Sequence, residues 1–205
     1  MTTPFWKRVS AEAVGTFALV FAGTAAIVVN DVSGGAVTHV GIALTFGLWA
    51  ARRFPTRLVV PYVAAQLLGA VGASILLAAL FPDHSTLGGT RPSGSDRQSL
   101  VFEAVLTSGL VLVILCVSVG DGVKRITAGL AIGSVIALEA LFAGPVSGAS
   151  MNPARSFAPA FVAWQWGSLW VYLLGPVAGA VLAVPVCRAV REPGCCGRTS
   201  LCPTG

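Results

Sequence analysis

The chain has 205 residues, of which 55% are hydrophobic and only 10% are charged, and its mean hydropathy is +0.83. These values are typical of an integral membrane protein, and the sequence offers no nucleophile–base pair, metal-ligand cluster or phosphate-binding loop for an enzyme. The net charge of +5 is accounted for by basic loops on one side of a membrane, so we expect no nucleic-acid partner. Since no metal-ligand constellation is found, we also expect no metal, and we expect no cofactor.

Six apolar runs follow one another along the chain. They cover residues 9–29, 36–51, 58–81, 100–119, 126–143 and 169–186. At about 20 residues per span, this pattern predicts an all-α membrane protein with six transmembrane helices. The second run is short for a span, because about 16 residues give roughly 24 Å of helix.

Basic residues predict the orientation of these helices. With a cytoplasmic N-terminus, ten of the thirteen basic residues lie on the cytoplasmic side, as the positive-inside rule requires, and both termini are cytoplasmic. Arg91 and Arg97 lie in outer loops, and Arg155 lies in an apolar stretch. Short loops and an N-terminus with Lys7 and Arg8 favour a bacterial plasma membrane.

Residues 144–160 are too short and too rich in small residues to cross a bilayer. Asn152 before Pro153 predicts a helix start, and Pro159 limits that helix to one or two turns before a disturbance. Arg155 is costly at membrane depth and marks a pathway or a site, although a structural arginine paired with backbone carbonyls fits as well. Irregular backbone is tolerated there where it lines a cavity, so we expect a re-entrant segment.

An internal repeat relates the two halves of the chain. Residues 12–16 match 103–107, and residues 67–71 match 173–177, which makes the first repeat about 15 residues shorter than the second. An inverted repeat of three spans places a site at the membrane midplane. The expected organisation is one transmembrane domain over 1–193, with repeats over 5–81 and 99–190, and a flexible tail over 194–205 that carries Cys195, Cys196 and Cys202.

Residues 147–157, Ser-Gly-Ala-Ser-Met-Asn-Pro-Ala-Arg-Ser-Phe, resemble the second signature loop of the aquaporin (major intrinsic protein) family. Residues 11–17, 64–70 and 173–180 are similar to helices of that family. The resemblance implies an aquaporin-like inverted repeat of six helices in the lipid bilayer, assembled as a homotetramer. It also implies a passive channel for water and small uncharged solutes.

One departure from the family is large, because Asn-Pro-Ala occurs only once in this sequence. The end of the second helix and the first signature loop look excised after Leu48, and residues 49–53 resemble what normally follows them. The first re-entrant half-helix is therefore expected to be missing.

The resemblance also places candidate pore residues. The constriction corresponds to Phe46, Ala140, Ala149 and Arg155, and the signature motif to Asn152, Pro153 and Ala154. Water-selective members usually carry histidine where this chain has Ala140, so the filter is wider and favours glycerol-like solutes or metalloid acids alongside water. Glycerol channels carry aspartate where this chain has Ser156, so the filter is mixed and the identity of the transported solute is undecided. Without the family, Phe46 and the two alanines fit ordinary helix packing.

Acidic residues within the spans are costly. By resemblance, Glu103 and Glu12 each brace one signature loop, and we expect Glu12, which has lost its loop, to be protonated or hydrated. Glu139 faces either the pore or a neighbouring subunit, and His39 and His84 are isolated. Two further functions stay open: a non-conducting or leaky truncated homologue and, more weakly, a proton-coupled secondary transporter.

Overall fold

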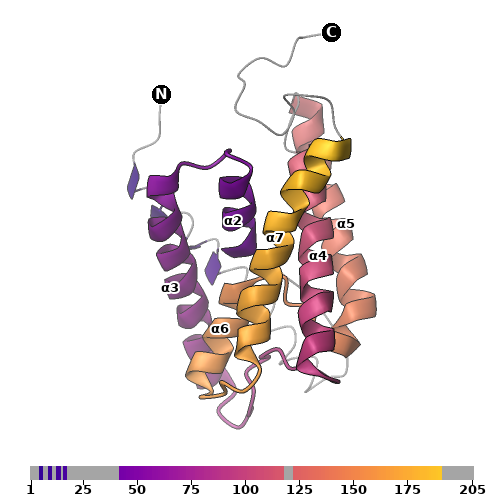
Figure 1. Ribbon diagram of the computed structural model, residues 1–205. Coiled ribbons are helices and arrows are strands. Elements are labelled where there is room, and N and C mark those ends of the chain that lie inside the picture. The colour runs from indigo at the N-terminus through magenta and orange to yellow at the C-terminus, as the bar shows by residue number, and fades with distance from the viewer. Residues whose placement is uncertain are drawn as a thin grey trace.

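The computed structural model describes residues 5–6, 9–10, 13–14, 16–17, 42–117 and 122–190. Regular structure within these ranges is helical throughout (Figure 1). The helices are α2 (Ile42–Ala50), α3 (Thr56–Leu80), α4 (Asp96–Val117), α5 (Gly122–Ser147), α6 (Pro153–Val162) and α7 (Leu169–Val190). The expectations for Glu12, His39, Cys195, Cys196 and Cys202 lie outside the described residues.

Three of the described helices, α3, α4 and α7, are long and apolar enough to cross a membrane. Helix α5 holds a shorter apolar stretch, Ala131–Ser147. These four helices coincide with the last four predicted spans, so the expectation of an all-α membrane fold is confirmed for this part of the chain. Helix α2 covers nine residues of the second predicted span and ends at a turn before α3, and residues 36–41 of that span lie outside the described residues.

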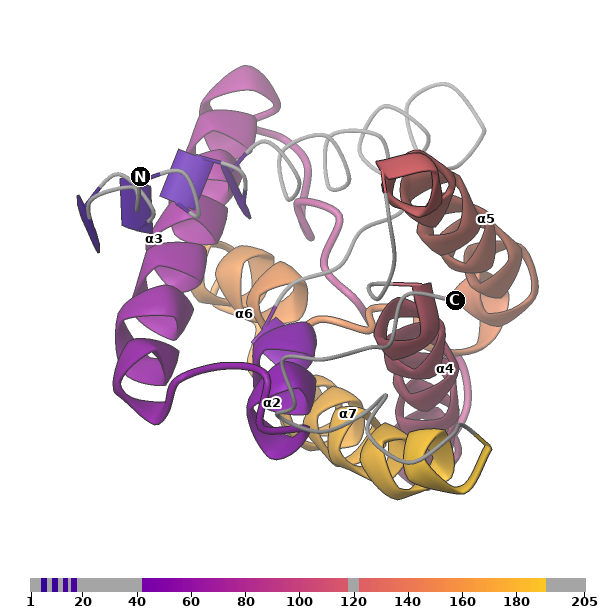
Figure 2. The same ribbon diagram turned by 90° about the horizontal axis from the view of Figure 1, so that it is seen from above.

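The long helices stand side by side, and the two short helices lie between them (Figures 1 and 2). In Figure 1, α2 occupies the upper half of the molecule and α6 the lower half, and each is followed by a long helix, α3 or α7, that runs back along it. The pairs α2–α3 and α6–α7 point in opposite directions along the bundle axis. This is the inverted arrangement that the sequence repeat predicts.

Glycines allow the long helices to approach closely. A Cβ added at Gly179 in α7 would lie 2.1 Å from the carbonyl oxygen of Ala104 in α4. In the first half, a Cβ at Gly69 in α3 would lie 2.3 Å from the carbonyl oxygen of Ala13. Gly69 corresponds to Gly175 in the sequence repeat, and Gly175 also touches α4 at Glu103. Both halves therefore use small residues at the same kind of helix crossing, as is common in membranes.

Helix α2 is packed tightly against the second half of the chain. A Cβ at Gly47 would lie 2.8 Å from Cγ1 of Val111 in α4 and 3.4 Å from Cβ of Ala180 in α7. After α2, Arg53 donates a hydrogen bond from Nη1 to the carbonyl oxygen of Leu115, 3.2 Å away. A guanidinium beside the last carbonyls of α4 also interacts favourably with that helix dipole. These contacts fix α2 inside the bundle.

Candidate functional site

The short helix α6 begins as the sequence predicts. Asn152 is its N-cap in an extended conformation, Pro153 occupies the first turn, and Asn152 Oδ1 accepts a hydrogen bond from the Ala154 amide at 3.1 Å. The expected disturbance at Pro159 is wrong, because α6 continues to Val162. Pro159 is buried together with its neighbours, so tertiary packing outweighs the loss of one intrahelical hydrogen bond.

The loop before α6 has a strained backbone. Gly148, Ala149 and Met151 have φ values of +82°, +42° and +52°, a region that costs residues with a Cβ about 1–2 kcal/mol each. Such a conformation persists only where the surroundings hold it. It turns successive backbone amides toward the side chain of Glu103.

Glu103, on α4, holds this loop in place. Its Oε1 accepts hydrogen bonds from the hydroxyl of Ser147 at 2.8 Å and from the amide of Ser150 at 2.9 Å. Its Oε2 accepts a third from the amide of Met151 at 2.7 Å. The side chain is fully buried. Tyr172 of α7 adds a hydrogen bond from its hydroxyl to the carbonyl oxygen of Ser147 at 2.6 Å.

A chain of hydroxyl groups connects the loop to the segment between α3 and α4. Ser150 Oγ and Ser156 Oγ are 2.5 Å apart, and Thr90 donates to Ser156 Oγ at 2.6 Å. Ser93 donates to the carbonyl oxygen of Pro145 at 2.7 Å. Sequence reasoning missed Thr90 and Ser93, because a polar loop carries no signal that tells which hydroxyl will meet the site.

Arg155 lies in the first turn of α6 and is almost fully buried. Its Nη1 donates a hydrogen bond to the carbonyl oxygen of Gly88 at 2.9 Å. Gly88 has a φ of +70°, which glycine adopts without strain. The loop between α3 and α4 thus supplies a backbone partner for the guanidinium, in agreement with the structural role considered for this arginine.

The N-termini of α2 and α6 meet at Asn152. The backbone amide of Ile42 donates to Asn152 Oδ1 at 2.9 Å. An amide inside a helix bonds the carbonyl four residues earlier, so this bond is typical of the first turn. Asn152 is fully buried, and its Nδ2 has no hydrogen-bond partner among the described residues. One oxygen is therefore held by two helices, while the attached NH₂ group stays available.

The structure brings some of the predicted filter residues together and separates others. Ala149 and Arg155 flank Asn152 in one loop, and half-buried Ala140 lies on α5, one turn before Ala143, which belongs to the same apolar cluster as Ala149. Phe46 is on α2, one turn beyond Ile42. Helices α2 and α6 extend in opposite directions in Figure 1, and Phe46 packs against the apolar cluster that holds Ile42, Ala154 and Ala158.

Glu139 lies between α4 and α5. It is buried, a Cβ at Gly109 of α4 would lie 3.1 Å from its Oε1, and its Oε2 has no partner among the described residues. Its carboxyl group thus faces α4, which the sequence left undecided. His84 accepts a hydrogen bond at Nδ1 from the Leu87 amide and shapes the loop. Within the described ranges, no three His, Cys, Asp or Glu residues form a potential metal site.

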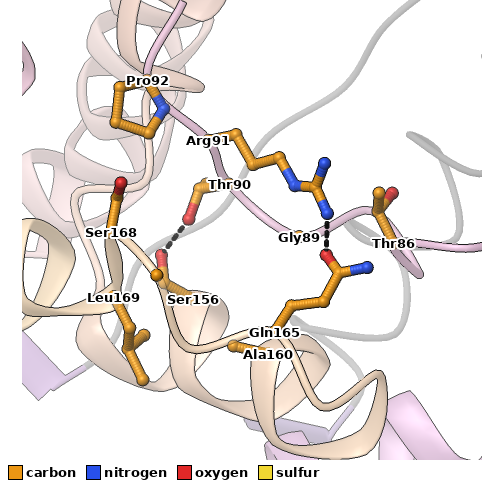
Figure 3. A pocket seen from close by; sticks show the side chains of 11 residues that line it. Thr86, Gly89, Thr90, Arg91, Pro92, Ser156, Ala160, Gln165, Ser168 and Leu169 are labelled. Carbon is orange, nitrogen blue, oxygen red and sulfur yellow. Dashed lines mark hydrogen bonds between the residues drawn. The ribbon is translucent and has the colours of Figure 1, made fainter. Parts of the chain in front are cut away.

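A cavity of about 390 Å³ lies between the loop after α3 and the side of α6 that carries Ser156 and Ala160 (Figure 3). Ser156, Thr90, Gly89 and Gln165 are among the residues that line it. The guanidinium of Arg91 donates to the side-chain oxygen of Gln165, and Gln165 Nε2 donates to the Ser85 carbonyl at 2.6 Å. The cavity therefore adjoins the residue that follows Arg155 and is closed in part by side-chain hydrogen bonds.

A family profile described as "Major intrinsic protein" matches residues 24–186. The chain belongs to the major intrinsic protein family. It is an integral membrane protein and not an enzyme. It is 41% identical to "Aquaporin NIP1-1" of Oryza sativa subsp. japonica, over 93% of this chain and 76% of that protein. It is 40% identical to "Nodulin-26" of Glycine max, over 93% of this chain and 80% of that protein.

A solved structure has the same fold. The X-ray structure of the aquaglyceroporin from Plasmodium falciparum superposes with a TM-score of 0.74 and covers 90% of this chain and 95% of that chain. Its sequence identity is 18%, so this similarity concerns the fold alone. The alignment with the rice relative spans 216 positions, more than the 205 residues of this chain, so that relative has residues that this chain lacks.

Proposed function

We propose that the chain is a passive channel for water and small uncharged solutes, including glycerol-like molecules and metalloid acids. The observation that carries this proposal is the side chain of Asn152, whose buried Nδ2 has no partner among the described residues at the junction of α2 and α6. A buried donor without a partner costs about 1–3 kcal/mol. A passing molecule with an oxygen acceptor would offset that cost at each crossing.

Charge at the junction opposes ions. The N-termini of α2 and α6 both contribute positive dipole ends, and Arg155 adds a fixed positive charge one turn away. Cations, including protons, would meet this barrier, whereas neutral molecules would not. Arg155, Ala149 and Ala140 are the proposed constriction on the α6 side, and we place Phe46 on the path at the α2 side.

The relatives support the class of solute. Two of the similar proteins are named as an aquaporin and an aquaglyceroporin. A filter with alanine at positions 140 and 149 leaves room beside Arg155 for a molecule larger than water. A path with one polar side, Arg155, and one apolar side suits small uncharged molecules with several hydroxyl groups.

A second candidate is a non-conducting or leaky homologue. It is favoured by the single Asn-Pro-Ala motif and by the positions of the rice relative that this chain lacks. A proton-coupled transporter has less support, because Glu103 is engaged by the loop and Glu139 lies apart between α4 and α5. The experiment below separates these functions.

We also propose that the protein assembles as a homotetramer in a lipid bilayer. Outward-facing apolar side chains of α5, among them Leu138, Leu141 and Phe142, suit contact with lipid or with another copy in a homotetramer. The inverted repeats over 5–81 and 99–190 would together form a single channel domain. The rice and soybean relatives are plant proteins, which gives no support to a bacterial plasma membrane.

The test is stopped-flow light scattering on proteoliposomes under osmotic and glycerol gradients, beside empty liposomes. Conduction predicts faster shrinkage than in empty vesicles, and Arg155→Ala should alter the water-to-glycerol ratio and raise proton leak, measured with an internal pH dye. Arg57→Ala, at an exposed arginine of α3, is the matched control and should behave as wild type. Permeability equal to that of empty vesicles, from correctly folded protein, would overturn the proposal in favour of the non-conducting homologue.

A further inference from the structure

The placement of α2 within the bundle differs from that of a second transmembrane span. By the sequence repeat, α5 is the counterpart of a second span in the first half, and α6 is the counterpart of the half-helix that the sequence lacks. Among the described helices, α5 packs on α4 alone, whereas α6 packs on both α3 and α7. Helix α2 packs mainly on α7 and then on α3, with smaller contacts to α4 and α6. Its neighbours are therefore those of a half-helix.

The direction of α2 agrees with this placement. Its described part has nine residues, and α6 has ten. Figure 1 shows that both start near mid-height and extend toward opposite faces of the bundle. Each is followed by a tight turn and a long helix, and Gln66 of α3 donates to Thr45 Oγ1 of α2 at 3.1 Å, which ties the short helix to its own long helix.

We propose that Ile42–Ala50 serves as the missing first half-helix, and that the backbone amide of Ile42 is the positioning group that fixes Asn152 from the opposite side of the junction. The residues resemble the family's second helix, yet the excision leaves them directly before the turn into α3, where a half-helix belongs. The backbone N–H of Ile42 replaces the contact that a first Asn-Pro-Ala motif would supply.

The contacts at Asn152 assign this role to the amide of Ile42. Asn152 Oδ1 accepts from Ile42 N at 2.9 Å and from Ala154 N at 3.1 Å, so one donor comes from each short helix. With the oxygen held from both sides, the side-chain amide cannot rotate, and the buried NH₂ group keeps one direction. The junction thus presents one amide donor from Asn152, and the side chain of Ile42 packs with Ala154 and Ala158 in an apolar cluster.

The role of the amide is tested with Ile42→Pro and Ile42→Val in proteoliposomes. Proline lacks the N–H but fits the first turn of a helix, whereas valine has a similar size and keeps the donor. We expect water permeability to be roughly fivefold lower in Ile42→Pro than in Ile42→Val, the size of one ordinary hydrogen bond. Equal permeability of the two variants would overturn the role of the amide.

The position of α2 is tested by cross-linking, which does not depend on conduction. Only the permeability test of the Ile42 amide rests on the proposed channel function. Cβ atoms at positions 47 and 180 would be 3.4 Å apart, close to disulfide geometry. In a chain without its native cysteines and with Val111→Ala to make room, Gly47→Cys with Ala180→Cys should cross-link. The matched pair with Val181→Cys, which is more exposed on α7, should not. Absence of the 47–180 cross-link would overturn the proposed position of α2, even if the channel conducts. A chain that forms the cross-link but does not conduct would overturn only the proposed channel function.

Discussion

Replacing Glu103 tests how the loop before α6 is held. In Glu103→Gln, the amide oxygen can keep the hydrogen bonds from Ser147 and Ser150, but the new NH₂ group then faces the amide of Met151, which was 2.7 Å from Oε2. Two donors in contact leave a buried N–H unsatisfied, which costs about 1–3 kcal/mol. For a chain of this length, that corresponds to a fall of roughly 2–12 °C in melting temperature.

Glu103→Ala should cost more than Glu103→Gln. The amides of both Ser150 and Met151 then lose their acceptor, and the left-handed backbone at Ala149 and Met151 is no longer held. Two unsatisfied amides cost roughly 2–6 kcal/mol, less whatever the loop regains by relaxing. The loop also positions Asn152 and Arg155, so solute permeability should fall together with stability.

The assay is thermal unfolding of detergent-solubilised protein, followed by intrinsic fluorescence, together with proteoliposome permeability. Glu139→Gln is the matched control, because Glu139 is also buried but its Oε2 has no partner among the described residues. We expect that control to change stability by less than about 1 kcal/mol. The reasoning is refuted if Glu103→Gln melts at the wild-type temperature, or if Glu139→Gln is destabilised as much as Glu103→Gln.

Two further substitutions test the packing around the site, each by the melting temperature in detergent. Gly179→Ala should destabilise the protein by at least about 1–3 kcal/mol, because the new Cβ would lie 2.1 Å from the Ala104 carbonyl oxygen. The control is Gly133→Ala, whose new Cβ would meet no neighbouring side chain or other helix within 4 Å, so it should be neutral or slightly stabilising. Equal effects of the two substitutions would contradict the close crossing of α4 and α7. Tyr172→Phe should cost about 1 kcal/mol, since it removes the hydrogen bond to the Ser147 carbonyl, and an unchanged melting temperature would show that this bond contributes nothing.

Local features of the sequence determined much of this protein. The apolar runs predict α3, α4, α5 and α7 because a bilayer requires about 20 apolar residues for each spanning helix. The dipeptide Asn152-Pro153 predicts the start of α6, since a capping side chain followed by proline matches the needs of a helix N-terminus. The signature around Arg155 identified the family, and the family profile agrees.

Only the tertiary structure decided the place of α2. Residues 36–51 read as a short span, because hydropathy reports composition and not depth in the membrane. What places Ile42–Ala50 at the junction is contact with distant parts of the chain: Gly47 fits against Val111 and Ala180, and Ile42 donates to Asn152. The same holds for Pro159, where packing kept α6 helical. Sequence fixes which segments are helical and apolar, whereas the depth and partners of a short helix depend on surfaces far away along the chain.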